Sequence, residues 1–233
     1  MKPDLDGPAD TSMMGIVHDA VRRDLTRTRD ALTTAPYPEG DRRRAIAGHV
    51  DWLMNFLHDH HTGEDAGLYP AVRAANPGAG QLLDAMDAEH QAIDPGMTHV
   101  RAAAGQWGRS GADIDRLALV DALDALSAVL LPHLEREESE AMPVVSASIT
   151  HRQWQQLDQE HNIKGKSIPQ LAEEGHFLVD GLDERRRQIV LHLVPAAPRW
   201  IMLYGFGPGY RRRAAARWGE SRAASRSGAQ PTT

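Results

Sequence analysis

One sequence pattern occurs twice in the chain, at His60–Pro70 and again at His133–Pro143. Each copy reads H-x-x-x-E-[D/E]-x-x-x-x-P and stands in a run of apolar residues with helical spacing. On a helix, positions i and i+4 lie one turn apart on the same face. Each copy therefore presents one imidazole and one carboxylate side by side, on the face that its apolar neighbours turn toward a core.

Apolar residues at steps of three and four predict four long amphipathic helices. The helices span about 12–33, 41 to beyond 64, 81–107 and 113–141. Four such helices with short connections predict an all-α fold, an up-down-up-down four-helix bundle. Proline removes a backbone donor, so we expect Pro70 to help end the second helix. For the same reason we expect Pro95 to kink the third helix and Pro132 to distort the fourth.

The predicted bundle, residues 12–150, is flanked by segments of different character. Residues 1–11 contain Pro, Gly and Asp and are expected to form a flexible lead-in. Residues 151–220 are predicted to form a C-terminal helical extension. Its stretch at 200–210, which three arginines follow, is expected to pack against the bundle or a second subunit, with a membrane-surface element as the alternative. The extension is therefore a candidate interface for a homodimer. Residues 221–233 have the composition of a disordered tail.

Six polar residues stand inside the apolar stripes of the four helices: His18, His60, Glu64, His90, His133 and Glu137. Burying an ionised carboxylate without a partner is very costly, so these groups are expected to converge around cations. His18 and His60 are assigned to one metal ion. His90 and His133 are assigned to a second ion, and the two glutamates are assigned as bridges. Imidazole and carboxylate ligands without sulfur suit iron or manganese, and less specifically zinc.

The set resembles the hemerythrin family, in its bacterial HHE cation-binding form. The resemblance covers roughly residues 12–150 and rests on His18, His60-x-x-x-Glu64, Glu89-His90 and His133-x-x-x-Glu137, in that order. It implies a four-helix bundle with two iron ions in an oxo- or hydroxo-bridged non-haem centre (Fe–O–Fe), with manganese or zinc as alternatives. It also implies that the centre meets O2, peroxide or NO.

The chain differs from the oxygen-carrying members of that family at two positions. Those proteins place a second histidine four residues after the third-helix histidine, where this chain has Asp94. They place an aspartate five residues after the last histidine, whereas Glu137 follows His133 by four. Asp94 is either a further ligand, a carboxylate that orients a ligand imidazole, or the residue that accommodates the Pro95 kink. The set of four histidines and two glutamates is closer to bacterial di-iron proteins of iron-centre repair and stress, which carry a cysteine-bearing segment.

Two other histidines are candidates for the site or its surroundings. His61 and Asp65 repeat the i,i+4 spacing one position round the helix and are interpreted as outward-facing or as support for the ligands. The alternative is that this pair, rather than its neighbours, faces the metal. His161 follows Glu160 as His90 follows its own glutamate. It is either a surface histidine or a further ligand, if the extension folds over the end of the bundle.

Composition excludes several classes of function. None of the 233 residues is a cysteine, which excludes disulfides, thiolate zinc sites and cysteine-ligated iron–sulfur clusters. The formal net charge of −6 gives no general attraction to nucleic acid. No run approaches the ~18–20 apolar residues that span a bilayer, and the N-terminus has no apolar signal region. We therefore expect no membrane span and a cytoplasmic location.

These features give three functional hypotheses. The first is a non-haem di-iron protein that binds, removes or senses O2, peroxide or NO. The second is a di-iron oxidase or oxygenase for a small organic substrate, which needs a wider pocket. The third is a non-enzymatic iron or redox sensor whose extension signals to a partner. Whether the protein is an enzyme stays open, and no catalytic residue is assigned beyond the metal ligands.

Overall fold

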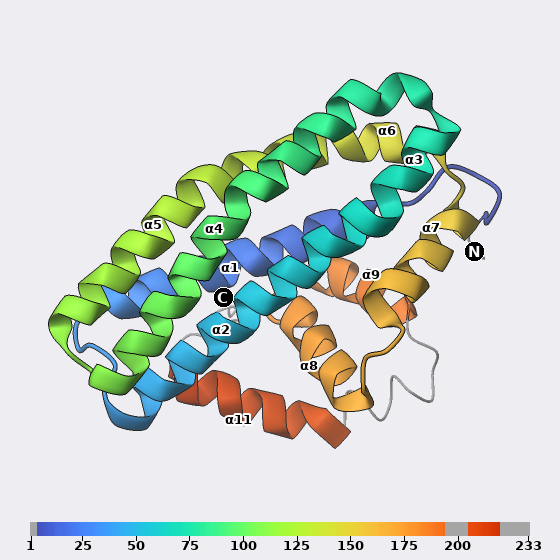
Figure 1. Cartoon of the computed structure of the whole chain (residues 1–233). Coiled ribbons are helices and arrows are strands. Elements are labelled where there is room, and N and C mark those ends of the chain that lie inside the picture. The colour runs from blue at the N-terminus through green and yellow to red at the C-terminus, as the bar shows by residue number, and fades with distance from the viewer. Residues whose placement is uncertain (1–3, 194–204, 220–233) are drawn as a thin grey trace, which may run out of the picture.

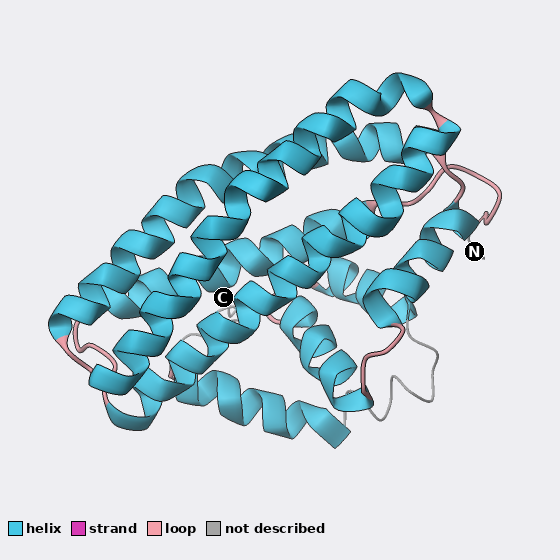
Figure 2. Cartoon of the chain, in the orientation of Figure 1, coloured by secondary structure: helices cyan, strands magenta, loops and turns pink. Residues whose placement is uncertain are grey.

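The computed structural model describes residues 4–193 and 205–219. Helices make up almost all of these ranges, and no strand occurs in them beyond an isolated bridge between Pro8 and Thr150 (Figure 2). The predicted all-α class is confirmed. Residues 200–204 and 221–233, for which an apolar contact and a disordered tail are predicted, lie outside the described residues.

Four long helices form the body of the molecule. They are α1 (Ser12–Thr33), α2 (Gly40–Gly63), α4 (Gly80–Ser110) and α5 (Asp113–Arg136). α1 packs against α2 and α5, and α4 packs against the same two helices, so the four enclose a shared interior (Figure 1). α4 continues through Pro95, and α5 continues through Pro132.

Each copy of the repeated motif forms a π-helical turn that begins at its glutamate. α2 leads into η1 (Glu64–Leu68) and α3 (Tyr69–Ala75), while α5 leads into η3 (Glu137–Ala141) and α6 (Met142–Ser148). Pro70 and Pro143 stand in the first turn of the helix that follows, where a missing backbone N–H costs little. The prediction that Pro70 ends the helix is therefore wrong, because helical structure continues to Ala75.

The bundle interior contains two apolar clusters with a polar layer between them. On α2, for example, buried apolar residues of the larger cluster run to Leu57, and the smaller cluster begins at Leu68 in η1. The motif histidine and glutamate fall between these two positions. On α5 the larger cluster includes Leu134, directly after His133, and the smaller one begins at Ala141, so Glu137 again lies between the two clusters. The sequence thus places its polar residues at one level of the bundle.

The extension consists of short helices that lie on the bundle. They are α7 (His151–Asp158), η4 (Gln159–Ile163), α8 (Ile168–Val179), α9 (Glu184–Leu193) and α11 (Gly207–Trp218). α8 and α9 contact α1, α11 contacts α2 and α8, and η4 contacts α2. Residues of the lead-in are tied to the start of this extension, since His151 donates a backbone hydrogen bond to Gly7 at 2.9 Å.

One helical rod, Asp113–Ser148, is long and apolar enough to cross a membrane by length and composition alone. Core helices of bundles meet the same criterion. This rod supplies buried residues such as Leu123, Leu126 and Leu130 to the larger apolar cluster. We therefore interpret its apolar character as that of a core helix.

Candidate metal centre

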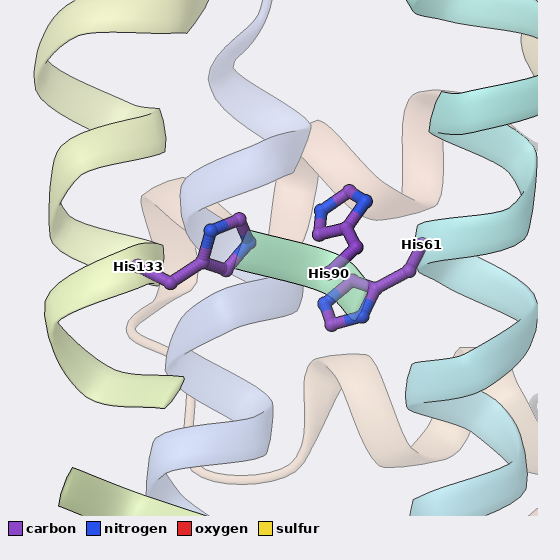
Figure 3. A group of neighbouring side chains, drawn as sticks. All are labelled: His61, His90 and His133. Carbon is purple, nitrogen blue, oxygen red and sulfur yellow. The ribbon is translucent and has the colours of Figure 1, made fainter. Parts of the chain in front are cut away.

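Two groups of ligand-type side chains meet in the polar layer. One group is His18, His60 and Glu137, and the other is His61, His90 and His133. Within each group the ligand atoms lie within 4.8 Å of one another. Figure 3 shows the second group, in which the three imidazoles extend toward one another from α2, α4 and α5. Each group has the composition of a metal site that uses nitrogen or oxygen ligands.

The two glutamates of the repeated motif lie between the groups. One oxygen of Glu64 is 3.3 Å from His60 Nε2, and its other oxygen is 3.7 Å from His90 Nε2. Oε2 of Glu137 lies 3.3 Å from His18 Nε2 and 3.9 Å from His133 Nε2. All six residues predicted as ligands are thus brought together: Glu64 has one oxygen near each group, whereas Glu137 belongs to the first group and lies 3.9 Å from His133 of the second.

His61 belongs to the interior, so its interpretation as an outward-facing residue is wrong. Its side chain is only 4% exposed, and its ring stacks on His90 with 4.1 Å between centroids. The signal was present in the sequence, because Met54, Leu57 and His61 follow one another at steps of three and four. A core-facing stripe is wide enough to hold His60 and His61 together. The structure therefore gathers five imidazoles where the sequence analysis counted four.

Asp94 and His161 lie outside both groups. Asp94 is 58% exposed and faces His58 at 3.4 Å on the surface. Ile93 and Met97 occupy the buried face of α4 at this level, which turns Asp94 away from the interior. The structure thus gives no support to Asp94 as a ligand or as a support for one. The extension folds against α2, but His161 is exposed and its ring lies against Gly67 in η1, so the structure favours the surface alternative for this histidine.

Three of the converging imidazoles are held from behind by carboxylates. The pairs are His18 Nδ1 with Glu138 at 2.7 Å, His90 Nδ1 with Asp65 at 2.7 Å, and His133 Nδ1 with Glu89 at 2.9 Å. In each ring the remaining nitrogen, Nε2, then faces the interior. Metal-bound histidines commonly have such a carboxylate, which fixes the tautomer and the orientation of the ring.

Sequence analysis missed part of this outer layer. Glu138 belongs to an acidic run, whose residues other than Glu137 read as a solvated surface, yet Arg22 binds Glu138 at 2.7 Å and turns it toward the interior. Arg136 holds Glu89 in the same way. Tyr69, five residues after Glu64, was also missed. It is fully buried, and its hydroxyl donates to Oε1 of Glu137 at 2.7 Å.

The donor atoms in the layer lack partners within the described part of the chain. The unpartnered buried atoms are both ring nitrogens of His61, both oxygens of Glu64, Nε2 of His90 and of His133, and Oε2 of Glu137. Buried polar atoms in proteins are almost always satisfied by hydrogen bonds. Every atom in this set can donate an electron pair to a cation. The residues therefore fit one or more bound metal ions.

The electrostatics of the layer favour the same interpretation. Burial, together with nearby histidines, lowers the pKa of His61 well below its ordinary value and that of His60 to about 3. Burial and the charge of Glu137 raise the pKa of Glu64 well above its ordinary value. Burial alone would raise the pKa of Glu137, but a hydrogen bond and charge from His18 lower it. The neutral form of His60 and His61 is the one that binds metal, and a cation would displace the proton of Glu64. Burial alone would lower the pKa of His18, but Glu137 and Glu138 raise it, so a cation would displace the proton of that ring as well.

Comparison with known protein families gives an independent result. The hemerythrin HHE cation-binding domain matches residues 11–145, which is more than half of the chain. Comparisons with curated proteins and with solved structures give no match. The matched range begins one residue before α1 and ends within α6, so it contains every residue of the two candidate ligand groups. The chain therefore belongs to the hemerythrin family, with an HHE cation-binding domain at residues 11–145.

Proposed function

We propose that this protein holds two iron ions in its bundle and reacts with O2, peroxide or NO at that centre. His18, His60 and Glu137 would hold one ion. His61, His90 and His133 would hold the other, with Glu64 between them. The proposal follows from the donor set, because imidazole and carboxylate ligands without sulfur suit iron. Manganese suits the same ligands, and zinc suits them less specifically.

The single observation that carries the proposal is the set of buried, unpartnered donor atoms at one level of the bundle. Leaving an isolated carboxylate in an apolar interior costs several kcal/mol or more. Both oxygens of Glu64 are in that position among the described residues. Two cations among the carboxylates and the imidazoles would offset this cost at each of these unpartnered atoms.

The chain supplies the surroundings, and bound iron supplies a redox centre and Lewis acid. The apolar clusters above and below the polar layer limit the entry of water. Tyr69 donates a hydrogen bond to one oxygen of Glu137, which leaves the other oxygen facing His18. Glu138, Asp65 and Glu89 hold three rings in place.

The test is metal content together with reactivity. Protein isolated after growth with iron should contain two iron ions per chain and absorb in the near ultraviolet, as oxo-bridged di-iron centres do. Peroxide, O2 or NO should change that absorption. Glu137→Ala should lose most of the iron, while Glu140→Ala, at an exposed carboxylate three residues away, should keep it. If the absorption of the iron-loaded protein does not change with peroxide, O2 or NO, the proposal is contradicted.

A sensor function is the second candidate, because the extension lies directly against the turn that carries Glu64. A sensor would change the docking of residues 151–193 with metal state and would release no oxygen from peroxide. An enzyme that removes peroxide would release oxygen, and His60→Ala would abolish that release. These two measurements separate the candidates.

A further inference from the structure

The extension meets the metal-bearing helix at two glycines that flank Glu64. Gly63 directly precedes this glutamate, and Gly67 follows it by three residues within η1. A β-carbon on residue 67 would overlap the ring of His161, and one on residue 63 would lie 3.0 Å from the side-chain oxygen of Asn162. Any side chain at residue 67 would have to displace the His161 ring, whereas at residue 63 the Asn162 side chain would have to give by a few tenths of an ångström.

The segment that makes this contact is itself a π-helical turn, η4. Asn162 is oriented within it by a 3.0 Å hydrogen bond from its amide to Asp158. The preceding helix, α7, packs Trp154 and Leu157 against the smaller apolar cluster, which includes Leu68 and Tyr69. The extension thus covers the outer side of η1 from Gly67 to Tyr69, while Glu64 occupies its inner side.

The second copy of the motif offers a comparison within the same chain. At the positions that correspond to Gly63 and Gly67 it has Arg136 and Glu140. These two side chains are 36% and 53% exposed and pair with each other at 3.2 Å. Glycine is therefore not needed to make a π turn after the motif histidine. Its presence in the first copy follows from the docked extension.

A π turn is rare and occurs mostly as a single turn within an α-helix, often at a functional site. The second copy forms its π turn without a docked segment, so the extension adds support to a turn that both copies adopt. In η1 the backbone N–H of Tyr69 bonds to the carbonyl of Glu64, five residues back. A return to α-helical bonding would shift the register of every residue after Glu64. If the docked extension and a bound metal ion both favour the π form over the α form, each one strengthens the binding of the other, and the coupling is reciprocal.

We propose that His161 is a positioning residue for the metal centre. The contact of its ring with Gly67 stabilises the π-helical form of η1, in which Glu64 faces the metal. Docking of the extension and occupancy of the metal site then strengthen each other. This inference rests on the metal site of the proposed function, but it does not depend on iron or on redox chemistry.

The experiment uses zinc, which is redox-inert, added to the chelator-treated full chain. Gly67→Ala introduces a methyl group where the His161 ring lies, and His161→Ala removes the ring without touching the bundle. Because alanine also favours helix at position 67, the two variants must agree for the effect to be assigned to the contact. The matched controls are Glu140→Ala, at the equivalent position of the second copy, and His99→Ala, at an exposed histidine of α4.

Both test variants should bind zinc more weakly than wild type, by about 5- to 50-fold for a coupling of ordinary size. In wild type, zinc should slow amide hydrogen exchange in residues 151–163, and this response should vanish in both variants. Unchanged zinc affinity in both variants would overturn this inference and leave the metal site standing. The same holds if zinc does not change amide hydrogen exchange in the wild-type chain. A wild-type chain that binds no zinc would overturn the metal site and the inference with it.

Discussion

Two of the buried polar clusters in the described part of the chain satisfy their polar atoms in opposite ways. The metal layer gathers five histidines and two glutamates whose inward atoms mostly lack partners within the described residues. The other cluster joins Asp24 of α1 to His49 of α2, some three turns from His60. Here every carboxylate oxygen has a protein donor: His49 Nε2 at 2.7 Å on one side, and Arg23 and Arg27 at 2.8 and 3.3 Å on the other.

The difference separates structural histidines from candidate ligands. Both His49 and His61 are 4% exposed, so burial alone does not distinguish them. His49 has a carboxylate at hydrogen-bond distance, whereas neither ring nitrogen of His61 finds a partner in the part of the chain that the structure describes. An unsatisfied buried polar group costs about 1–3 kcal/mol. His49 is already satisfied, so only His61 would gain from a ligand that does not belong to the chain.

The largest expected effect comes from replacing these two histidines by the same residue. His61→Leu should lower the metal content from two ions per chain to about one, because one of the two groups loses a ligand. His49→Leu should keep both ions. The unfolding free energy of the metal-free chain should show the reverse, with the larger change in His49→Leu. It should fall by roughly 1–3 kcal/mol in His49→Leu, which leaves Asp24 short of a donor, and change little in His61→Leu.

Metal analysis and urea unfolding of chelator-treated protein measure the two responses. Equal metal loss in both variants would mean that the clusters do not differ as the structure indicates. A drop in metal-free stability for His61→Leu as large as that for His49→Leu would show that His61 already has a partner in the folded chain.

Asp24→Asn tests the self-contained cluster directly. The substitution removes the charge that Arg23, Arg27 and His49 surround, so the unfolding free energy should fall by roughly 2–3 kcal/mol near neutral pH. Metal content should not change. Urea unfolding of the chelated variant beside wild type gives the first number, and a variant that loses metal would show that the two clusters are linked.

The difference in unfolding free energy between wild type and Asp24→Asn should depend on pH. Burial alone would raise the pKa of Asp24, but the hydrogen bond from His49 and the charge of Arg23 outweigh it and lower the native pKa below the ordinary 3.8. A carboxylate with a lowered native pKa adds stability above its unfolded pKa and loses it as the pH falls toward the native one. The difference between wild type and Asp24→Asn should therefore be complete at pH 6 and shrink below about pH 3.8. A difference that stays constant down to pH 3 would contradict the assignment.

The carboxylates behind the ligands should give the smallest effect. Glu89→Gln keeps the size of the side chain but weakens the hydrogen bond to His133, so metal affinity should fall by about 10- to 100-fold. Glu140→Gln is the control, because Glu140 also binds Arg136 but contacts none of the converging histidines. Competition with a chelator of known affinity measures both. Equal losses would assign the effect to Arg136 and not to His133.

The repeated motif and the apolar stripes predicted the long helices and the level at which the polar residues meet. They could not predict the two π turns, because spacing within one helix does not distinguish a π turn from an α-helical one. Periodicity also could not separate His60 from His61, since both fall within a wide core-facing stripe. Glu138 was missed as a support for a ligand ring, because its role depends on contacts with another helix, which spacing within one helix does not reveal. Asp65 was one of the supports that the sequence suggested, and it does contact His90.

The most direct test of the account is anomalous X-ray scattering from a crystal of the iron-loaded full chain. The account predicts two anomalous peaks in the bundle interior. One should lie among His18, His60 and Glu137, and the other among His61, His90 and His133, with Glu64 between them. A crystal that binds iron only at surface carboxylates, with the seven interior side chains hydrogen bonded to one another or to water, would contradict it.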